Sequence, residues 1–253
     1  MSLPKAGLFC WAGESREAAF FLEAALGEWA ATGHAEPLLV DCQPKKDPEL
    51  LVPHRAGRGL PLGDLRLFGE PGVPCLRSAQ LAQAVKEAQR KGKLEWFDGK
   101  TLFFLPSRDR VMPFAEFCHE VLFLAPAAKE SVGALYNLAS SLNALKGRSV
   151  AISVVVTGTD RIESAAEFLQ NAKDEISKLS PVNAEIGFAG HFCVKEDKLR
   201  LARESGKRYE ELFAQDGLFG QLKAIGRRWL SDVSPAMDCS SMAELADRIS
   251  AIA

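Results

Sequence analysis

The sequence lacks the marks of a membrane, secreted or metal-binding protein. No stretch of its 253 residues approaches the roughly 18 apolar residues that a membrane-spanning helix needs. Residues 1–15 hold one lysine and too short an apolar stretch for a signal peptide. The cysteines never form the close pairs of a zinc or redox site, and they stand at Cys10, Cys42, Cys75, Cys118, Cys193 and Cys239. These absences predict reduced thiols, no bound metal and a cytoplasmic location.

An excess of charge is missing as well. The 31 basic and 33 acidic residues give a formal net charge of -2, so the protein as a whole has no field that attracts DNA or anionic membranes. The chain also lacks internal repeats and low-complexity tracts. Its 47% hydrophobic and 25% charged residues exclude a disordered or collagen-like protein. The length suits one large domain with a single core.

Short apolar runs alternate with segments of helical periodicity along the chain. The runs are typical of buried strands and lie at residues 6–11, 37–42, 101–105, 119–126, 149–156 and 184–189. The helical segments lie at residues 17–31, 77–91, 131–145, 163–179, 199–211, 218–230 and 242–252. The run at 101–105 also suits the second arm of a hairpin through Asp98-Gly99. The alternation predicts an α/β fold, with a mostly parallel central sheet and helices on both faces.

Residues 43–75 differ from the rest of the chain. They contain six prolines and five glycines, which predicts a long and mostly irregular excursion. A loop of this length is uncommon unless it is functional, so it is the first candidate for a surface that binds a partner. The alternative is an ordered loop that packs over the protein and has no binding role. The basic residues assigned to this surface, with one from a later loop, are Lys45, Lys46, Arg55, Arg58 and Arg108. DNA binding through the basic residues 45–66 is a weaker alternative.

Three later segments resemble, in order and spacing, the MinD/ParA (SIMIBI class) family of P-loop ATPases. The first is CHEVLFLAPAAKES, in which Glu120 precedes a buried strand and Pro126 ends it. The second, SVVVTGTDRIES, carries Thr157 where the family's base-binding strand often has Asn or Thr. The third is GFAGHFCVKEDKLRLARESG, which matches a late family element. The resemblance implies one P-loop NTPase-like domain over residues 1–230, followed by a linker and C-terminal helix at 231–253.

The phosphate loop of this family is altered. A P-loop needs several glycines so that backbone N–H groups can approach the phosphates, a Lys for the β and γ phosphates, and a Ser or Thr for magnesium. Here the loop reads WAGESREAAF, with Gly13 as its one glycine, Arg16 near the Lys position and Glu17 near the hydroxyl position. Gly13, Ser15 and Arg16 are either a remnant of an anion cradle or a capped helix start, with Ser15 or Glu14 near the cap.

The carboxylates of the family's metal site are also missing. Asp41 remains at the end of the second strand, but Gln43 stands where the family has another Asp. Asp41 either keeps a contact to metal-bound water or accepts a neighbouring backbone N–H. In LFFLPSRDR, Phe104 occupies the carboxylate position of the family's D-x-P-x-G element, counted from Pro106. In an alternative alignment, this strand corresponds to a different family element and the strand that bears the acid is deleted. That alignment also leaves the chain without the carboxylate. The resemblance therefore implies a family member that lacks the Walker A and Walker B residues.

These observations predict a non-catalytic MinD/ParA-like protein that acts as a binding, regulatory or positioning module. We expect no bound cofactor and no hydrolysis, and a protein partner or a homodimer that forms without nucleotide. We expect no membrane binding by the last helix, because its polar face sets Arg248 against Glu244 and Asp247. The vestigial nucleotide-site positions are Gly13, Ser15, Arg16, Asp41 and Thr157.

The alternative is a nucleotide-binding ATPase with an unconventional phosphate site. In it, Arg16, Asp41 and Arg108 converge on the phosphates of ATP or ADP with magnesium. Arginine can replace lysine as an anion ligand, although it does not restore the close approach of the backbone that glycines provide.

Overall fold

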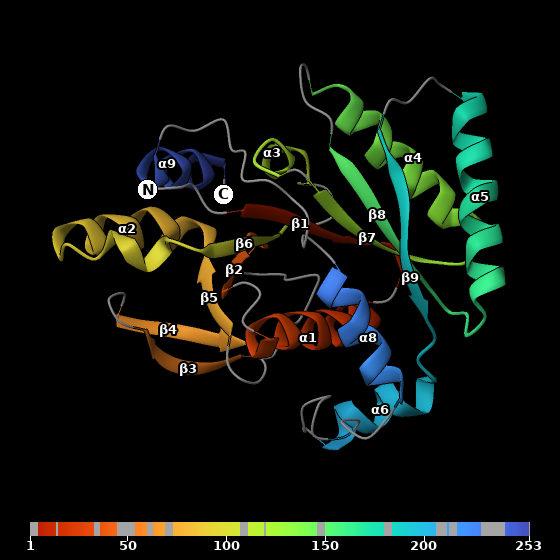
Figure 1. Cartoon of the computed structure of the whole chain (residues 1–253), viewed down its shortest axis with the longest axis horizontal. Helices are drawn as coiled ribbons and strands as arrows, with labels where there is room; N and C mark the ends of the chain where they lie inside the picture. Colours follow the sequence, from red (N-terminus) through yellow and green to blue (C-terminus); the bar gives the residue numbers. More distant parts are fainter. Residues whose placement is uncertain are drawn as a thin grey trace.

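The chain folds around one nine-stranded sheet, in the order β3-β4-β5-β2-β6-β1-β7-β8-β9 (Figure 1). The computed structural model describes residues 5–13, 15–32, 36–44, 54–59, 63–68, 73–106, 111–118, 120–145, 150–179, 184–205, 212, 217–228 and 241–252. The strands are β1 (Lys5–Trp11), β2 (Glu36–Asp41), β3 (His54–Gly59), β4 (Gly63–Phe68), β5 (Val73–Arg77), β6 (Lys100–Leu105), β7 (Glu120–Pro126), β8 (Ala151–Thr157) and β9 (Ile186–Phe192). The seven strands from β5 to β9 in this order run parallel, which confirms the predicted α/β class.

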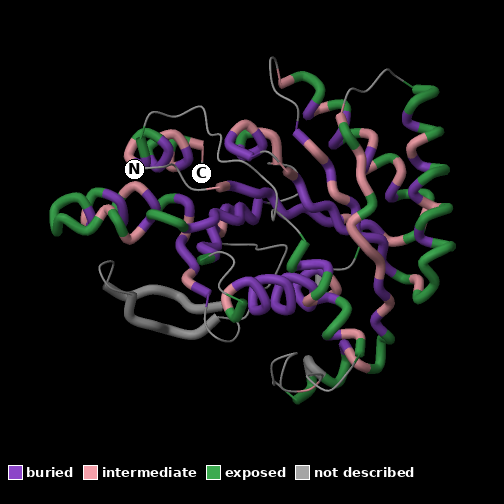
Figure 2. Tube along the Cα trace, viewed as in Figure 1, coloured by how far each residue is buried: buried purple, intermediate pink, exposed green. Residues whose placement is uncertain are grey.

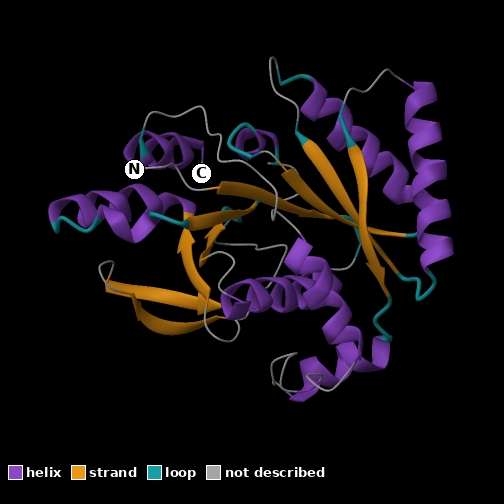
Figure 3. Ribbon diagram, viewed as in Figure 1, coloured by secondary structure: helices purple, strands orange, loops and turns teal. Residues whose placement is uncertain are grey.

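Helices cover both faces of the sheet (Figures 1 and 3). They are α1 (Ser15–Thr32), α2 (Ser78–Arg90), the 3-10 helix η1 (Leu94–Phe97), α3 (Met112–Ala115), α4 (Lys129–Asn143), α5 (Ile162–Leu179), α6 (Glu196–Ser205), α8 (Gly217–Arg228) and α9 (Met242–Ile252). One buried cluster joins the sheet to α1 and α8, and a second joins it to α2, α3, α4, α5 and α9. Successive residues of β1 alternate between the two clusters, as expected of a strand that is covered on both faces.

The prediction of a mostly irregular segment at 43–75 is wrong. The segment contains β3 and β4, which pair antiparallel with Gly59 opposite Gly63, and the first part of β5. β4 pairs antiparallel with β5, and β5 joins the parallel sheet beside β2. The strands were missed because HRAGRG lacks the apolar alternation of a half-buried strand, and because Pro74 lies inside β5, a position where proline normally argues against a strand.

The hairpin through Asp98-Gly99 is also wrong. Residues 98 and 99 form a turn between η1 and β6, in which Gly99 has a φ of 73°. β6 then pairs in parallel with β1 on one side and with β2 on the other. The apolar residues of β6 are fully buried between the two helical layers, so a central position suits this strand better than a hairpin arm.

Helix α1 is buried nearly all round. Every residue from 18 to 29 is buried (Figure 2), because the helix lies between the sheet and α8. The α8 side chains Phe219, Leu222 and Ile225 belong to the same buried cluster as α1. The sequence AAFFLEAAL, which is apolar apart from the buried Glu23, is typical of a helix with two covered faces.

The last helix, α9, packs against α2 and α3. Leu245 and Ile249 of α9 are fully buried, and the Ser250 Oγ donates to the Ser78 carbonyl at the start of α2 at 3.2 Å. The Arg248 guanidinium lies 4.9 Å from the centre of the Phe117 ring, just after α3. The apolar stripe of α9 is therefore part of the core. No helix in the described part of the chain combines the length and apolarity needed to cross a bilayer.

Candidate functional site

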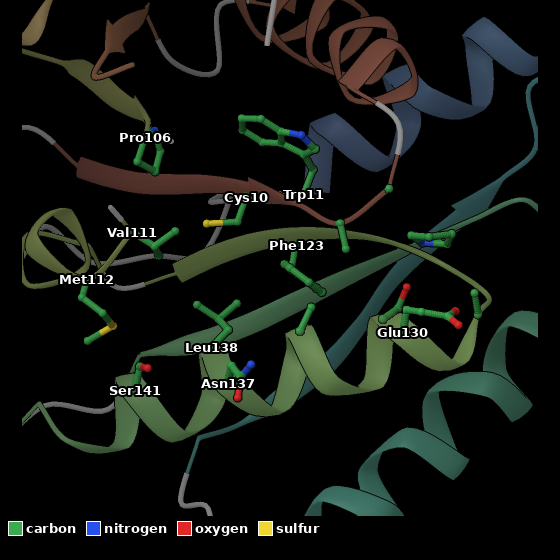
Figure 4. Close-up of a pocket in the computed structure, with 16 residues that line it drawn as sticks. Cys10, Trp11, Pro106, Val111, Met112, Phe123, Glu130, Asn137, Leu138 and Ser141 are labelled. Carbon is green, nitrogen blue, oxygen red and sulfur yellow. The ribbon is translucent and has the colours of Figure 1, made fainter. Parts of the chain in front are cut away.

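The candidate site lies where the central parallel strands end. β6, β1, β7 and β8 are neighbours in the sheet and run in the same direction, so their carboxyl ends share one edge. Ligands of open α/β sheets bind at this edge, outside the ends of the strands. The segments that follow β1, β6 and β7 meet here and line a pocket (Figure 4).

The loop after β1 is held tightly against the end of β7. The backbone N–H of Ala12 donates to the Leu124 carbonyl at 2.7 Å. Gly13 has a φ of 88°, and a Cβ atom built on it would lie 3.0 Å from the Pro126 ring. The positive φ favours glycine, and the contact with Pro126 leaves little room for a side chain. Packing against Pro126 thus explains the single glycine of this loop without a bound ligand.

The start of α1 carries charges of both signs. Arg16 is exposed, and the side chain of Ser15 lies outside the described residues. Nearby, burial and then the carboxylates of Glu17 and Asp160 raise the pKa of the Cys193 thiol. The ammonium of Lys195 lowers the same pKa, so charges of both signs act on Cys193.

Asp41 forms an ion pair on the side of β2 that faces β5. Its Oδ2 lies 3.3 Å from the Arg77 Nη1, and its Oδ1 accepts the Gln43 backbone N–H at 3.1 Å. Arg77 also donates to the Gln43 carbonyl at 3.1 Å. Both carboxylate oxygens of Asp41 therefore have protein partners, and the contact to the Gln43 backbone is one of the two roles expected for this carboxylate.

Asp41→Asn is expected to lower the free energy of unfolding by about 1–2 kcal/mol, because it removes the anion beside a largely buried guanidinium. Urea denaturation measures the change. Arg77→Gln is the matched variant, and the double variant should lose less than the sum of the single losses, since the two side chains interact directly. Additive losses would contradict the ion pair.

The end of β6 carries no carboxylate in the described part of the chain. Phe104, at the position expected for an acidic residue in the family, is fully buried. Its ring centre lies 6.0 Å from that of Phe114 and 6.3 Å from that of Phe117. The side chain therefore serves the core on the α3 side of the sheet, with no access to a bound metal or water.

Thr157 ends β8 and is 1% exposed. Its carbonyl accepts the Ala127 N–H at 3.0 Å, which ties the end of β8 to the segment after β7. Its Oγ1 is buried and has no hydrogen-bond partner among the described residues. Thr157 is thus close to Pro126 across the β7–β8 pairing but does not line the pocket.

The pocket lies between the strand ends and α4 and has a volume of about 680 Å³. Phe123 of β7 and Leu138 of α4 point toward one another across it, and Trp11 points away toward α1 (Figure 4). Its lining residues are Cys10, Trp11, Ala12, Gly13, Pro106, Val111, Met112, Phe123, Pro126, Ala128, Glu130, Ser131, Ala134, Asn137, Leu138 and Ser141. The one side chain among them that is charged at neutral pH is Glu130, because burial raises the pKa of the Cys10 thiol far above its usual range.

The other predicted site residues are not brought to this pocket by the described structure. Lys45, Lys46 and Arg108 lie outside the described residues. Arg55 and Arg58 are on β3, and their side chains are not described. No cluster of three or more His, Cys, Asp or Glu side chains suited to a metal ion occurs in the part that was described.

Two residues of this edge were not singled out by the sequence. Arg77, the partner of Asp41, lies 36 positions further along the chain, and only the pairing of β2 with β5 brings them together. Ser131 lines the pocket from the first turn of α4 and is 2% exposed. A signal for Ser131 exists in the sequence, because it shares the helical spacing of the buried residues Leu135, Leu138 and Leu142.

Comparison by sequence finds no matching family model and no matching curated protein. Comparison by structure finds a ParA family ATPase from Chlorobium tepidum TLS, with a TM-score of 0.57, 14% identity, and coverage of 88% of this chain and 98% of that one. The MinD cell division protein of Aquifex aeolicus gives a TM-score of 0.55 at 13% identity, over 91% of this chain and 98% of its own. The structure of pNOB8 ParA bound to nonspecific DNA gives a TM-score of 0.52 at 12% identity, with coverage of 91% of this chain and 100% of that one. The chain has the P-loop NTPase-like α/β fold of ParA and MinD.

Proposed function

We propose that this protein is a non-catalytic variant of the ParA/MinD fold that acts as a binding or positioning module through a protein partner or a nucleotide-independent homodimer. The observation that carries the proposal is the character of the pocket at the carboxyl edge of the sheet. Its described lining is mainly apolar, and the one charged side chain in it, Glu130, has the same sign as a nucleotide's phosphates.

The surrounding residues support the absence of hydrolysis. A phosphate site needs close backbone N–H groups and cations, and metal-assisted hydrolysis needs a carboxylate that holds the metal or its water. Gly13 is used to pack against Pro126, and Phe104 is buried in the core. Asp41 is held by Arg77 and by the Gln43 backbone. Gly13, Phe104 and Asp41 thus each have a structural role in the described part of the chain.

The positioning role rests on analogy of fold, which gives a class of function and not a mechanism. The similar structures include a MinD cell division protein in complex with MinC and a ParA bound to nonspecific DNA. Proteins of this shape thus bind macromolecules, and a member without nucleotide chemistry would keep that capacity without an ATP-driven cycle. Membrane attachment by α9 is not part of the proposal, since its apolar face is buried.

The test is a thermal-shift and calorimetric titration with ATP, ADP, GTP and GDP, with and without magnesium. We expect no shift of the melting temperature at millimolar nucleotide, whereas a ligand at 100 times its Kd stabilises a fold by about 2.7 kcal/mol. The Chlorobium tepidum ParA ATPase serves as the positive control. Arg16→Ala should leave stability and partner binding unchanged.

The opposite outcome would identify the alternative function. A magnesium-dependent shift that Arg16→Ala abolishes would establish a nucleotide site built on Arg16, with Arg108 and Asp41 as the next residues to mutate. DNA binding predicts retention on heparin that is lost when residues 45–66 are deleted; retention that survives the deletion argues against that loop.

A further inference from the structure

The pocket is an elongated groove along α4. Its lining includes Ser131, Ala134, Leu138 and Ser141, which follow one face of the helix. From residue 131 to residue 141 the helix rises by about 15 Å. Glu130 lies at one end of the groove and Met112 at the other (Figure 4). The volume of about 680 Å³ is within the range of small-molecule sites, which combine an apolar lining with a few polar groups.

Ser131 is the buried polar group of this groove. It is 2% exposed, and its Oγ has no hydrogen-bond partner among the described residues. Buried hydroxyl groups nearly always have a hydrogen-bond partner, because burial removes their hydrogen bonds to water and an unpaired hydroxyl does not recover that free energy. Ser131 also belongs to the first turn of α4, whose N-cap residue, Ala128, has no side chain that could cap the helix. The Ser131 backbone N–H already donates to the Ala128 carbonyl at 3.1 Å, so the polar group that a ligand can satisfy is the Ser131 hydroxyl.

The charge of the groove restricts the ligand. The helix N-terminus by itself would favour an anion. The carboxylate of Glu130 is in the same turn and opposes it, and the described lining contains no cation. The Cys10 thiol stays neutral because burial raises its pKa. A cation would meet the positive end of the α4 dipole, and the Glu130 carboxylate that could attract it is exposed and therefore screened by water. An uncharged molecule meets none of these penalties and still gains from the apolar lining.

We propose that the groove along α4 binds an uncharged, elongated and mainly apolar organic molecule, whose hydroxyl or carbonyl group pairs with the Ser131 hydroxyl. The groove begins at the loop after β1, where Ala12 and Gly13 line it, and extends along α4, where the body of the ligand would pack on Phe123 and Met112. The proposal rests on the proposed function in one respect, because the same apolar pocket carries both, but binding of octanol and binding of nucleotide are measured separately.

The test compares three probes with one chain and different head groups: 1-octanol, octanoate and octylammonium. Binding is measured by calorimetry and by the NMR signal of the Met112 methyl group. Octanol should bind saturably and shift the Met112 signal, and each charged probe should bind at least about tenfold more weakly, since a charge leaves water to enter the groove. Equal or tighter binding of octanoate or octylammonium would overturn the proposal.

Two variants locate the ligand, and a third is a control. Ala134→Phe fills the groove and should abolish octanol binding, while Ser140→Phe places the same ring on an exposed position of α4 and should leave it unchanged. Ser131→Ala should weaken octanol binding by about two- to twelvefold, the range for one hydrogen bond. It should not lower the melting temperature of the free protein, since the hydroxyl has no partner to lose in the described structure. This variant therefore remains informative if Ala134→Phe does not fold.

Other outcomes would overturn the proposal. If Ser131→Ala binds octanol as tightly as the original chain, the hydroxyl does not orient the ligand. If octanol does not bind, and Ala134→Phe instead converts a dimer into a monomer in sedimentation, the occupant of the groove is a second copy of the chain. Binding of octanol that Ala134→Phe leaves intact would place the ligand elsewhere.

Discussion

The double variant Leu245→Ala and Ile249→Ala is expected to lower the free energy of unfolding by about 4 kcal/mol or more. Both side chains are fully buried between α9 and the rest of the core, and each truncation to alanine in a core costs about 2–5 kcal/mol. The two losses need not add, because the residues are neighbours on one helix face. Urea denaturation followed by circular dichroism measures the change, with the original chain as the reference.

Asp247→Ala is the control on the same helix. Asp247 is exposed and pairs with Lys86 at 3.5 Å, an interaction that contributes at most about 1 kcal/mol. If the double variant unfolded at the same urea concentration as the original chain, α9 would not be part of the folded core. Its apolar face would then be available to a membrane or a partner, and the packing on α2 would be wrong.

Gly226→Ala is expected to destabilise the protein by about 2 kcal/mol or more. Gly226 lies where α8 crosses α1, and a Cβ atom there would come within 2.6 Å of the Ala25 Cα. The obstacle is backbone, so the helices must move apart. That movement would also disturb the hydrogen bond from the Trp29 Nε1 to the Gly226 carbonyl and the ion pair of Arg227 with Glu28. Thermal unfolding gives the difference.

Gly220→Ala, on the same helix, is the matched control and should have the opposite sign. Gly220 is exposed, and a Cβ atom there would meet nothing within 4 Å. Alanine should therefore stabilise α8 by about 0.5–1 kcal/mol, through its better helix propensity alone. If both alanine variants changed the stability equally, close packing of α8 on α1 would not be the reason for glycine at position 226.

The candidate site was predictable in part. The sequence pointed to the segments after β1, β2, β6, β7, β8 and β9, because parallel strands end at one edge. It also identified Asp41 and the replacement of the family carboxylate by Phe104. It did not reveal the ion pair of Asp41 with Arg77, which depends on the insertion of β5 beside β2. Nor did it reveal the groove, because a groove is the space that side chains of β7, α3 and α4 leave unfilled.

The sequence by itself determined the class of the fold. Apolar runs between helical segments can bury both faces of each strand only in a layered α/β arrangement, and the order of these segments resembles that of the MinD/ParA family. The tertiary structure decided the strand order, the antiparallel β3–β4 extension and the burial of α9 on α2. It also decided that Ser131 is buried beside an apolar groove. These features depend on contacts between residues far apart in the chain, which local periodicity does not record.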